Sequence, residues 1–262
     1  MFAFSKSTGS LIGACTATAL MFLSASASAA FVSYTIRGTP VIQVNNTYQP
    51  GATEFIISVG GQKGGLGSSD IDGTALGSVT GLKIDRLDDR TRFTAGSGPY
   101  VAPYLNFWIT DGAGKFAVIA NEPSDGDFQP LYNNGYDLDF SDLSNKAAKI
   151  FEATDKSWLP NAGVGTFTFA DFAAYIIQAP TVGQVTTGWP GLGTGAPREF
   201  GTNKAYGVNW VFGDTLSNYV SGNEGYVVAN ASVGGSVVPE PGSLALVGLA
   251  LAGLTCVRRR RA

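Results

Sequence analysis

The sequence contains no histidine, the side chain that most often exchanges protons near neutral pH. Ser-His-Asp and Cys-His catalytic arrangements and histidine-ligated metals are therefore excluded. Its two cysteines, Cys15 and Cys256, lie near the two ends of the chain. The residues between them can form neither a disulfide nor a thiolate zinc site. An enzyme built from this region would need a pair of carboxylates, as in glycosidases, or a lysine acting with a serine.

Charged residues are also scarce, at 14% of the chain with a net charge of −3. Lys6 and the arginines near the C-terminus supply five of the 17 basic residues, and Glu240 is one of the 20 acidic residues. The region between these flanking segments therefore carries a charge of about −7. Nucleic acids and anionic membrane surfaces bind basic patches, so we expect no nucleic acid as a partner of this region.

Residues 1–30 have the three parts of a secretory signal peptide. Lys6 supplies a positive charge, residues 11–23 supply an interrupted apolar stretch, and small residues follow. Ala27 and Ala29 occupy the positions of an Ala-X-Ala cleavage site, which predicts export. A lipidated Cys15 is an alternative, because the residues before it weakly resemble a lipoprotein box.

The last part of the chain has three consecutive elements. A linker at residues 234–241 ends in Val238, Pro239, Glu240 and Pro241, an uncharged apolar segment follows at 242–257, and residues 258–262 contain Arg258, Arg259, Arg260 and Arg261. A helix over residues 244–257 would be about 21 Å long. That is short for a bilayer core of about 30 Å, but local thinning and snorkelling absorb such a mismatch. We expect a transmembrane helix with its arginines in the cytoplasm and the preceding body outside.

A plain membrane anchor explains the apolar run and the arginines, but not the Pro-Glu-Pro element before them. The order of the three elements closely resembles the PEP-CTERM sorting signal of Gram-negative bacteria. This resemblance implies recognition and cleavage by an exosortase, after transient residence in the inner membrane. It implies delivery to the outer surface or to an extracellular polysaccharide matrix. Residues 238–241 would then be the substrate of the sorting enzyme.

The exported region, residues 31–233, is rich in glycine and has short apolar runs separated by turn residues. This pattern predicts an all-β fold, an antiparallel β-sandwich of jelly-roll-like type with one or two short helices. The clearest signal is a hairpin of residues 104–111 and 115–121, with Leu105, Phe107 and Ile109 on its core face. Further strands are expected at residues 31–37, 54–59, 82–84, 206–212 and 225–233. Helices are expected at 145–153 and at 171–177, where Asp171 is the N-cap, and Gly-rich loops at 60–73 and 181–202.

Several residue groups are candidate binding sites. Acidic pairs at Asp70 and Asp72 and at Asp125 and Asp127 suit calcium, although carboxylates of solvated turns have the same pattern. Trp189 lies in a Gly/Pro-rich loop and is a candidate glycan contact, whereas strand patterns place Trp108 and Trp210 in the core. The charged residues 85–92 predict a salt-bridged surface turn.

These observations favour an exported surface or matrix protein of structural or adhesive type, without enzymatic activity and with no required cofactor. A glycan-binding module for exopolysaccharide is the first alternative. A glycan hydrolase that uses two carboxylates is the second, and it requires a pocket with such a pair.

Overall fold

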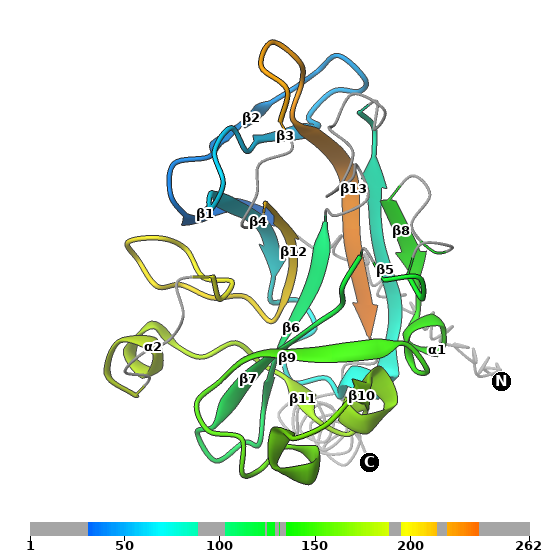
Figure 1. Cartoon of the computed structure of the whole chain (residues 1–262), viewed down its shortest axis with the longest axis vertical. Coiled ribbons are helices and arrows are strands. Elements are labelled where there is room, and N and C mark those ends of the chain that lie inside the picture. Colours follow the sequence, from blue (N-terminus) through cyan, green and yellow to red (C-terminus); the bar gives the residue numbers. More distant parts are fainter. Residues whose placement is uncertain are drawn as a thin grey trace, which may run out of the picture.

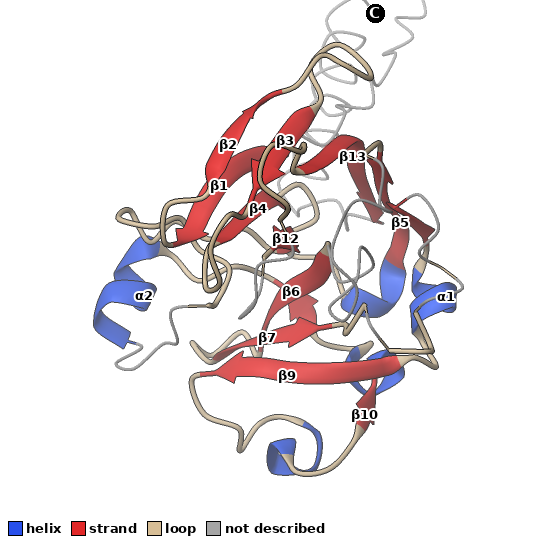
Figure 2. Cartoon of the chain, turned by 45° about the horizontal axis from the view of Figure 1, so that its top comes forward, coloured by secondary structure: helices blue, strands red, loops and turns tan. Residues whose placement is uncertain are grey.

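Two antiparallel sheets and a few short helices form the computed structural model, which describes residues 31–88, 103–123, 125–128, 131, 135–188, 195–213 and 219–235 (Figures 1 and 2). The predicted β-rich class with few short helices is thereby confirmed. Among the residues described, no helix combines the length and the apolar character that crossing a membrane requires. The predicted signal peptide and the predicted transmembrane segment lie outside these residues.

The larger sheet has eight strands in the order β1-β4-β12-β6-β7-β9-β10, with β11 beside β6. Its strands are β1 (Val32–Arg37), β4 (Lys63–Ser68), β6 (Tyr104–Thr110), β7 (Phe116–Ala120), β9 (Ala147–Ala153), β10 (Phe167–Thr168), β11 (Ile176–Ile177) and β12 (Val208–Phe212). β6 and β7 form the predicted hairpin, which is closed by the turn after Asp111. The expected strands at residues 31–37 and 206–212 correspond to β1 and β12.

The smaller sheet has five strands in the order β2-β3-β13-β5-β8. They are β2 (Val41–Val44), β3 (Thr53–Ile56), β5 (Val79–Arg86), β8 (Gly135–Leu138) and β13 (Tyr226–Gly235). Short helices connect the strands at η1 (Leu76–Ser78), α1 (Phe140–Leu143), η3 (Pro160–Gly163), η4 (Phe169–Phe172) and α2 (Val182–Gly188). The chain passes repeatedly from one sheet to the other, for example between β1 and β2, between β4 and β5 and between β12 and β13.

A single large core lies between the inner faces of the two sheets. Leu105, Phe107 and Ile109 are fully buried in it, which confirms the predicted facing of β6. Aromatic rings from opposite sheets stack across this core: Phe55 on Phe212 at 4.2 Å between centroids, and Tyr136 on Trp210 at 5.4 Å. Such pairs add about 0.5–1.5 kcal/mol to the free energy of burial.

The outer face of the larger sheet is also partly covered. Trp108 is fully buried there, packed with Phe116 and Val118 under residues of the segment between β11 and β12. Its indole Nε1 donates a hydrogen bond of 2.8 Å to the carbonyl of Pro197 in that segment. The middle of β6 is consequently buried on both faces. Its outward-facing polar side chains are therefore also enclosed by neighbouring residues.

Two segments expected to be a helix and a loop are strands of the larger sheet. Residues 147–153 form β9, which pairs with β7 and β10, although their alanines favoured a helix. Residues 63–68 form β4, between β1 and β12, although their glycines indicated a loop. Glycine is required at position 67 because a Cβ there would lie 2.6 Å from the ring of Tyr206.

Two further local expectations were wrong. The helix expected at residues 171–177 is not formed: η4 ends at Phe172, and residues 176–177 form β11. Thr168, and not Asp171, is the N-cap of η4, and the carboxylate of Asp171 accepts a hydrogen bond of 2.8 Å from the backbone of Thr168. The first part of the expected charged surface turn is buried: the side chains of Arg86 and Asp88 are both 0% exposed and form an ion pair of 3.0 Å. Asp88 also accepts a hydrogen bond from the backbone of Val227, which joins this pair to β13.

Candidate functional site

All residues proposed from the tail and the signal peptide lie outside the described part of the chain, as does Trp189. They are Ala27, Ala29, Val238, Pro239, Glu240, Pro241, Arg258, Arg259, Arg260 and Arg261. The acidic pairs, the hairpin and the larger sheet are described, and these provide the geometry that follows.

The two acidic pairs lie in different loops. Asp125 Oδ1 accepts a hydrogen bond of 3.0 Å from the backbone of Asp127, so this pair forms a tight exposed turn. Asp72, which follows Asp70 in the loop after β4, is partly buried against Gly207 and accepts a bond of 3.3 Å from Gln178 Nε2. No three acidic side chains gather at a metal-binding distance in the described residues. The calcium site stays a prediction.

Burial raises the pKa of Asp72 to about 7. Desolvation disfavours the charged carboxylate, and it outweighs the lowering effects of the Ala179 backbone and the Ser69 side chain. A further aspartate, Asp139, has a different role. Asp139 caps helix α1, where its Oδ1 accepts hydrogen bonds from the backbones of Ser141 and Asp142.

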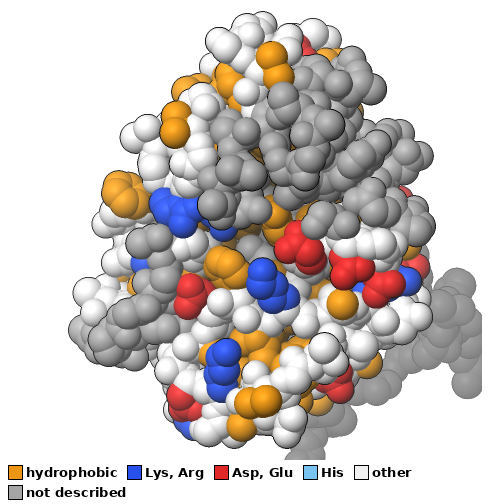
Figure 3. All heavy atoms as spheres, in the orientation of Figure 1, with side chains coloured by type: hydrophobic (Ala, Val, Ile, Leu, Met, Phe, Trp, Pro, Cys, Tyr) orange, Lys and Arg blue, Asp and Glu red, His pale blue; other side chains and the backbone are white. Residues whose placement is uncertain are grey.

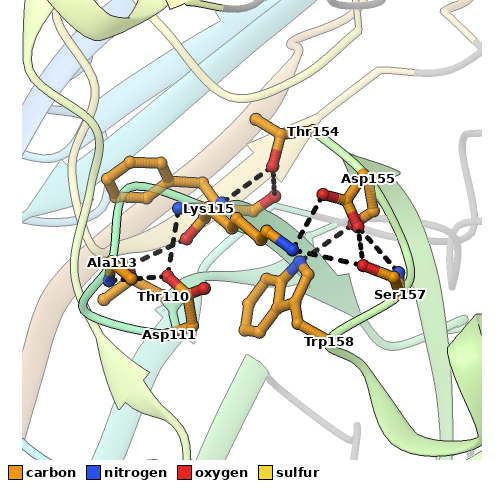
Figure 4. A network of polar contacts seen from close by, with 9 residues as sticks. Thr110, Asp111, Ala113, Lys115, Thr154, Asp155, Ser157 and Trp158 are labelled. Carbon is orange, nitrogen blue, oxygen red and sulfur yellow. Dashed lines mark hydrogen bonds and ion pairs between the residues drawn. The ribbon is translucent and has the colours of Figure 1, made fainter.

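A lysine and a serine do meet at the turn end of the hairpin (Figure 4). Lys115 Nζ lies 3.2 Å from Ser157 Oγ and 3.1 Å from a carboxylate oxygen of Asp155. Ser157 donates its hydroxyl proton to the same carboxylate, and Asp155 is exposed. A catalytic lysine is usually desolvated and lacks such an acidic partner. We interpret this network as a clamp between the hairpin turn and the loop after β9.

The strongest candidate site is a pocket on the outer face of the larger sheet, with a volume of about 70 Å³. It lies over five neighbouring strands, because strand pairing places Asn106 opposite Ala120 and Ala120 opposite Lys149. Its lining residues are Lys63, Tyr104, Asn106, Ala120, Asn121, Glu122, Lys149, Phe151 and Val211. Figure 3 shows basic, acidic and apolar side chains close together over the middle of the molecule, on the face seen in Figure 1.

Asn106 is the polar residue at the bottom of this pocket. It is 5% exposed, and its Oδ1 has no hydrogen-bond partner within the described part of the chain. An unpaired buried amide oxygen costs about 1–3 kcal/mol, and native proteins retain few of them. The oxygen itself is enclosed by the protein, so it is an unsatisfied buried atom and not an acceptor at the surface of the pocket.

The described lining residues include two lysines and one glutamate. Lys63 Nζ from β4 and Lys149 Nζ from β9 lie 5.2 Å and 6.0 Å from the centroid of the Phe151 ring. Glu122 is the one carboxylate among the lining residues, and it lies 4.0 Å from Lys149 Nζ. The pocket thus combines two ammonium groups, one carboxylate and an aromatic ring in a body that is acidic as a whole.

The neighbouring framework holds the pocket in place. Asn121 Oδ1 accepts a hydrogen bond of 2.8 Å from the backbone of Leu105, and its Nδ2 donates one of 3.2 Å to Tyr136 Oη. Tyr136 in turn stacks on Trp210 in the core. Both polar atoms of the Asn121 side chain thus form hydrogen bonds within the protein. Asn121 therefore positions the strand on which Asn106 lies.

This pocket was not predicted from the sequence. Two of its strands, β4 and β9, were expected to be a loop and a helix, so Lys63 and Lys149 could not be placed on one sheet. A weak signal was present in Asn106, which interrupts an apolar run in a segment that was itself recognised as a strand.

Comparison with known proteins adds information about the C-terminal segment. Residues 237–261 match the family model of the PEP-CTERM protein-sorting motif. Neither the search of curated proteins nor the search of solved structures found a match. The matched residues contain the Val-Pro-Glu-Pro element, the apolar segment and the arginines. The chain thus carries the PEP-CTERM sorting signal, which implies sorting to the cell surface by an exosortase.

Proposed function

We propose that the chain is a structural or adhesive protein of the bacterial surface or extracellular matrix, with a jelly-roll-like β-sandwich body. The observation that carries this proposal is the PEP-CTERM motif at residues 237–261. The body has no histidine and no cysteine, and its pocket has a single carboxylate among its lining residues, which favours a role other than catalysis. In this proposal residues 1–30 direct export, and residues 242–257 hold the chain in the inner membrane until the exosortase acts.

The test replaces Glu240 with Ala in the full chain, expressed in a host that has the exosortase. Immunoblotting should show accumulation of the unprocessed form, and labelling of intact cells should show reduced surface delivery. Ser243→Ala, just after the Pro-Glu-Pro element, is the matched control and should be processed normally. Normal processing and delivery of the Glu240 variant would contradict the role of this residue in sorting.

A second candidate function is binding of exopolysaccharide, and the outer-face pocket favours it. The lysine side chains that line the pocket are suited to acidic groups, and its aromatic side chains are suited to sugar rings. Glu122 is the single carboxylate among the described lining residues, which favours binding over the two-carboxylate chemistry of a glycosidase. Co-sedimentation of the full chain with the polysaccharide of its own host tests this function, and recovery in the supernatant would contradict it.

A further inference from the structure

A second hollow, the Arg37 hollow, lies at the end of β1 and shares no lining residue with the outer-face pocket. Its volume is about 230 Å³, and it is lined by Ile36, Arg37, Arg198, Phe200, Gly201 and Asn203. Arg37 also lines a wider hollow together with residues 38–39 and 59–62. The described lining residues of the two hollows include two arginines and no carboxylate, in a body that is acidic as a whole.

Arg198 already has partners within the protein. Its Nε donates a hydrogen bond of 3.2 Å to Asn203 Oδ1, and the charge of Glu152 attracts its guanidinium. Partial burial lowers the pKa of Arg198, an effect that the charge of Glu152 opposes. Arg198 therefore stabilises the turn of the hairpin at residues 198–205, whose two end residues form a β-bridge. A charge that is open to a ligand must come from Arg37.

Arg37 uses only part of its guanidinium within the protein. Its Nε donates a hydrogen bond to the carbonyl of Gly61, which holds the side chain against the loop before β4. Within the part of the chain that the structure describes, its two terminal nitrogens have no hydrogen bond or ion pair, and they are not among the buried unpaired atoms. Solvent therefore reaches them. Two terminal N–H groups can donate side by side to both oxygens of one carboxylate, which is the geometry that arginine favours.

Phe200 adds an exposed aromatic ring to the same hollow. The residue is 68% exposed, and its backbone N–H donates a hydrogen bond of 2.7 Å to the carbonyl of Thr35, which fixes it beside β1. Figure 1 shows this hairpin in yellow next to β1, and Figure 3 shows basic side chains beside an exposed apolar group on that side of the molecule. The ring can cover the C–H face of a sugar, because contact between apolar surfaces removes both from water.

We propose that the Arg37 hollow is a subsite for an acidic sugar, a uronate unit of a polysaccharide. The uronate carboxylate accepts hydrogen bonds from the terminal nitrogens of Arg37, and the C–H face of its ring packs on Phe200. The volume of about 230 Å³ is below the ~300–1,000 Å³ of sites that enclose a whole ligand, so the unit stays at the surface and its neighbours in the polysaccharide extend past the hollow. This inference rests on the second candidate function, names its ligand class and assigns it a surface separate from the outer-face pocket.

The test titrates the purified full chain with the trisaccharide of galacturonate and measures binding by isothermal calorimetry and by saturation-transfer NMR. Saturable binding is expected. The methyl ester of the trisaccharide keeps the rings without the charge and should bind at least about tenfold more weakly. Acetate supplies a carboxylate without a ring and should also be at least about tenfold weaker. Equal binding of the ester would overturn the contact with Arg37, equal binding of acetate would overturn the assignment to a sugar, and the absence of saturable trisaccharide binding would overturn the subsite.

Two variants and their matched controls locate the binding. Arg37→Gln should weaken the trisaccharide by at least about tenfold, and Phe200→Ala should weaken it by about three- to tenfold. Lys83→Gln removes a half-exposed strand lysine of the smaller sheet, and Val164→Ala trims an apolar side chain that is 67% exposed, so both should bind as the parent does. Urea unfolding checks that Arg37→Gln retains the fold, and Phe200→Ala removes only an exposed ring. Unchanged binding by either test variant would overturn the proposal.

A further variant separates this subsite from the outer-face pocket. Loss of trisaccharide binding in Lys149→Gln but not in Arg37→Gln would place the binding in that pocket and overturn the present assignment. Co-sedimentation of the parent chain with the polysaccharide of its host, combined with unchanged trisaccharide binding by Arg37→Gln, would overturn this subsite while leaving the second candidate function intact.

Discussion

Asn106 and Asn209 face each other on strands β6 and β12 of the larger sheet, but their amides are used differently. Asn209 is 0% exposed with both ends of its amide hydrogen-bonded, whereas Asn106 is 5% exposed with an unpaired Oδ1. Burial raises the pKa of Tyr34 well above its usual range, so its hydroxyl keeps the proton that it donates to Asn209. We conclude that Asn209 stabilises the sheet through its hydrogen bonds, whereas the oxygen of Asn106 contributes none among the described residues.

This difference predicts that substitutions of Asn106 and Asn209 have unequal effects on the free energy of unfolding. Asn106→Leu should leave the free energy of unfolding unchanged within about 1 kcal/mol, because it removes an unpaired polar group. Asn209→Leu should lower it by about 2–4 kcal/mol, because Tyr34 Oη and the carbonyl of Tyr206 both lose a partner. Urea unfolding of the full chain measures both values. Equal losses for the two variants would show that Asn106 has a structural role as well.

The facing of β6 predicts a second pair of stabilities. Phe107→Ala should cost about 3–5 kcal/mol, because it leaves a cavity in the core between the sheets. Thr110→Ala should cost about 0.5–1.5 kcal/mol, because Thr110 Oγ1 donates to the carbonyl of Lys115 and accepts from the backbone of Gly112. Urea unfolding compares the two variants, and a larger loss for Thr110 would contradict the assigned facing.

The buried ion pair of Arg86 and Asp88 predicts a strong effect of removing one partner. Arg86→Met should lower the free energy of unfolding by about 3–5 kcal/mol, because the carboxylate of Asp88 would remain buried without its counter-charge. Lys83→Met on the same strand is the control, since its ion pairs at 3.9 Å and 4.0 Å are half-exposed, and its effect should be below about 1 kcal/mol. Thermal unfolding can rank these variants, and similar midpoints would argue against burial of the pair.

Asp72 predicts a pH dependence of stability. Its pKa in the folded state is about 7, above the ordinary value of 3.8, so the folded chain binds more protons than the unfolded chain between these values. The free energy of unfolding should therefore fall as the pH rises from about 4 to about 7. One pKa unit corresponds to about 1.4 kcal/mol, and partial exposure of the carboxyl reduces this, so we expect a change of roughly 1–3 kcal/mol.

The variant Asp72→Asn isolates this contribution. Relative to the parent chain, it should gain stability at pH 8 more than at pH 5, since an amide has no charge to bury. Asp137→Asn, whose side chain is 84% exposed in the parent, should retain the pH dependence because Asp72 is intact. Urea unfolding at the two pH values measures the difference. A parent chain and Asp72 variant with parallel pH profiles would contradict the shifted pKa.

The sequence by itself determined those features that depend on composition or on neighbouring residues. The absence of histidine excluded whole classes of chemistry, and the order of Pro-Glu-Pro, apolar segment and arginines predicted the sorting motif. The alternation in the hairpin predicted which side chains of β6 are in the core, because side chains on a strand alternate between faces.

The tertiary structure alone decided what depends on partners that are distant in the chain. Residues 63–68 are a strand because β1 and β12 pair with them and because Tyr206 lies on Gly67, and no local pattern indicates such partners. The alanines of β9 are likewise held extended by β7 and β10 against their helical preference. The pocket depends on both strands, since Lys63 and Lys149 approach Asn106 when non-local hydrogen bonding brings their strands into one sheet.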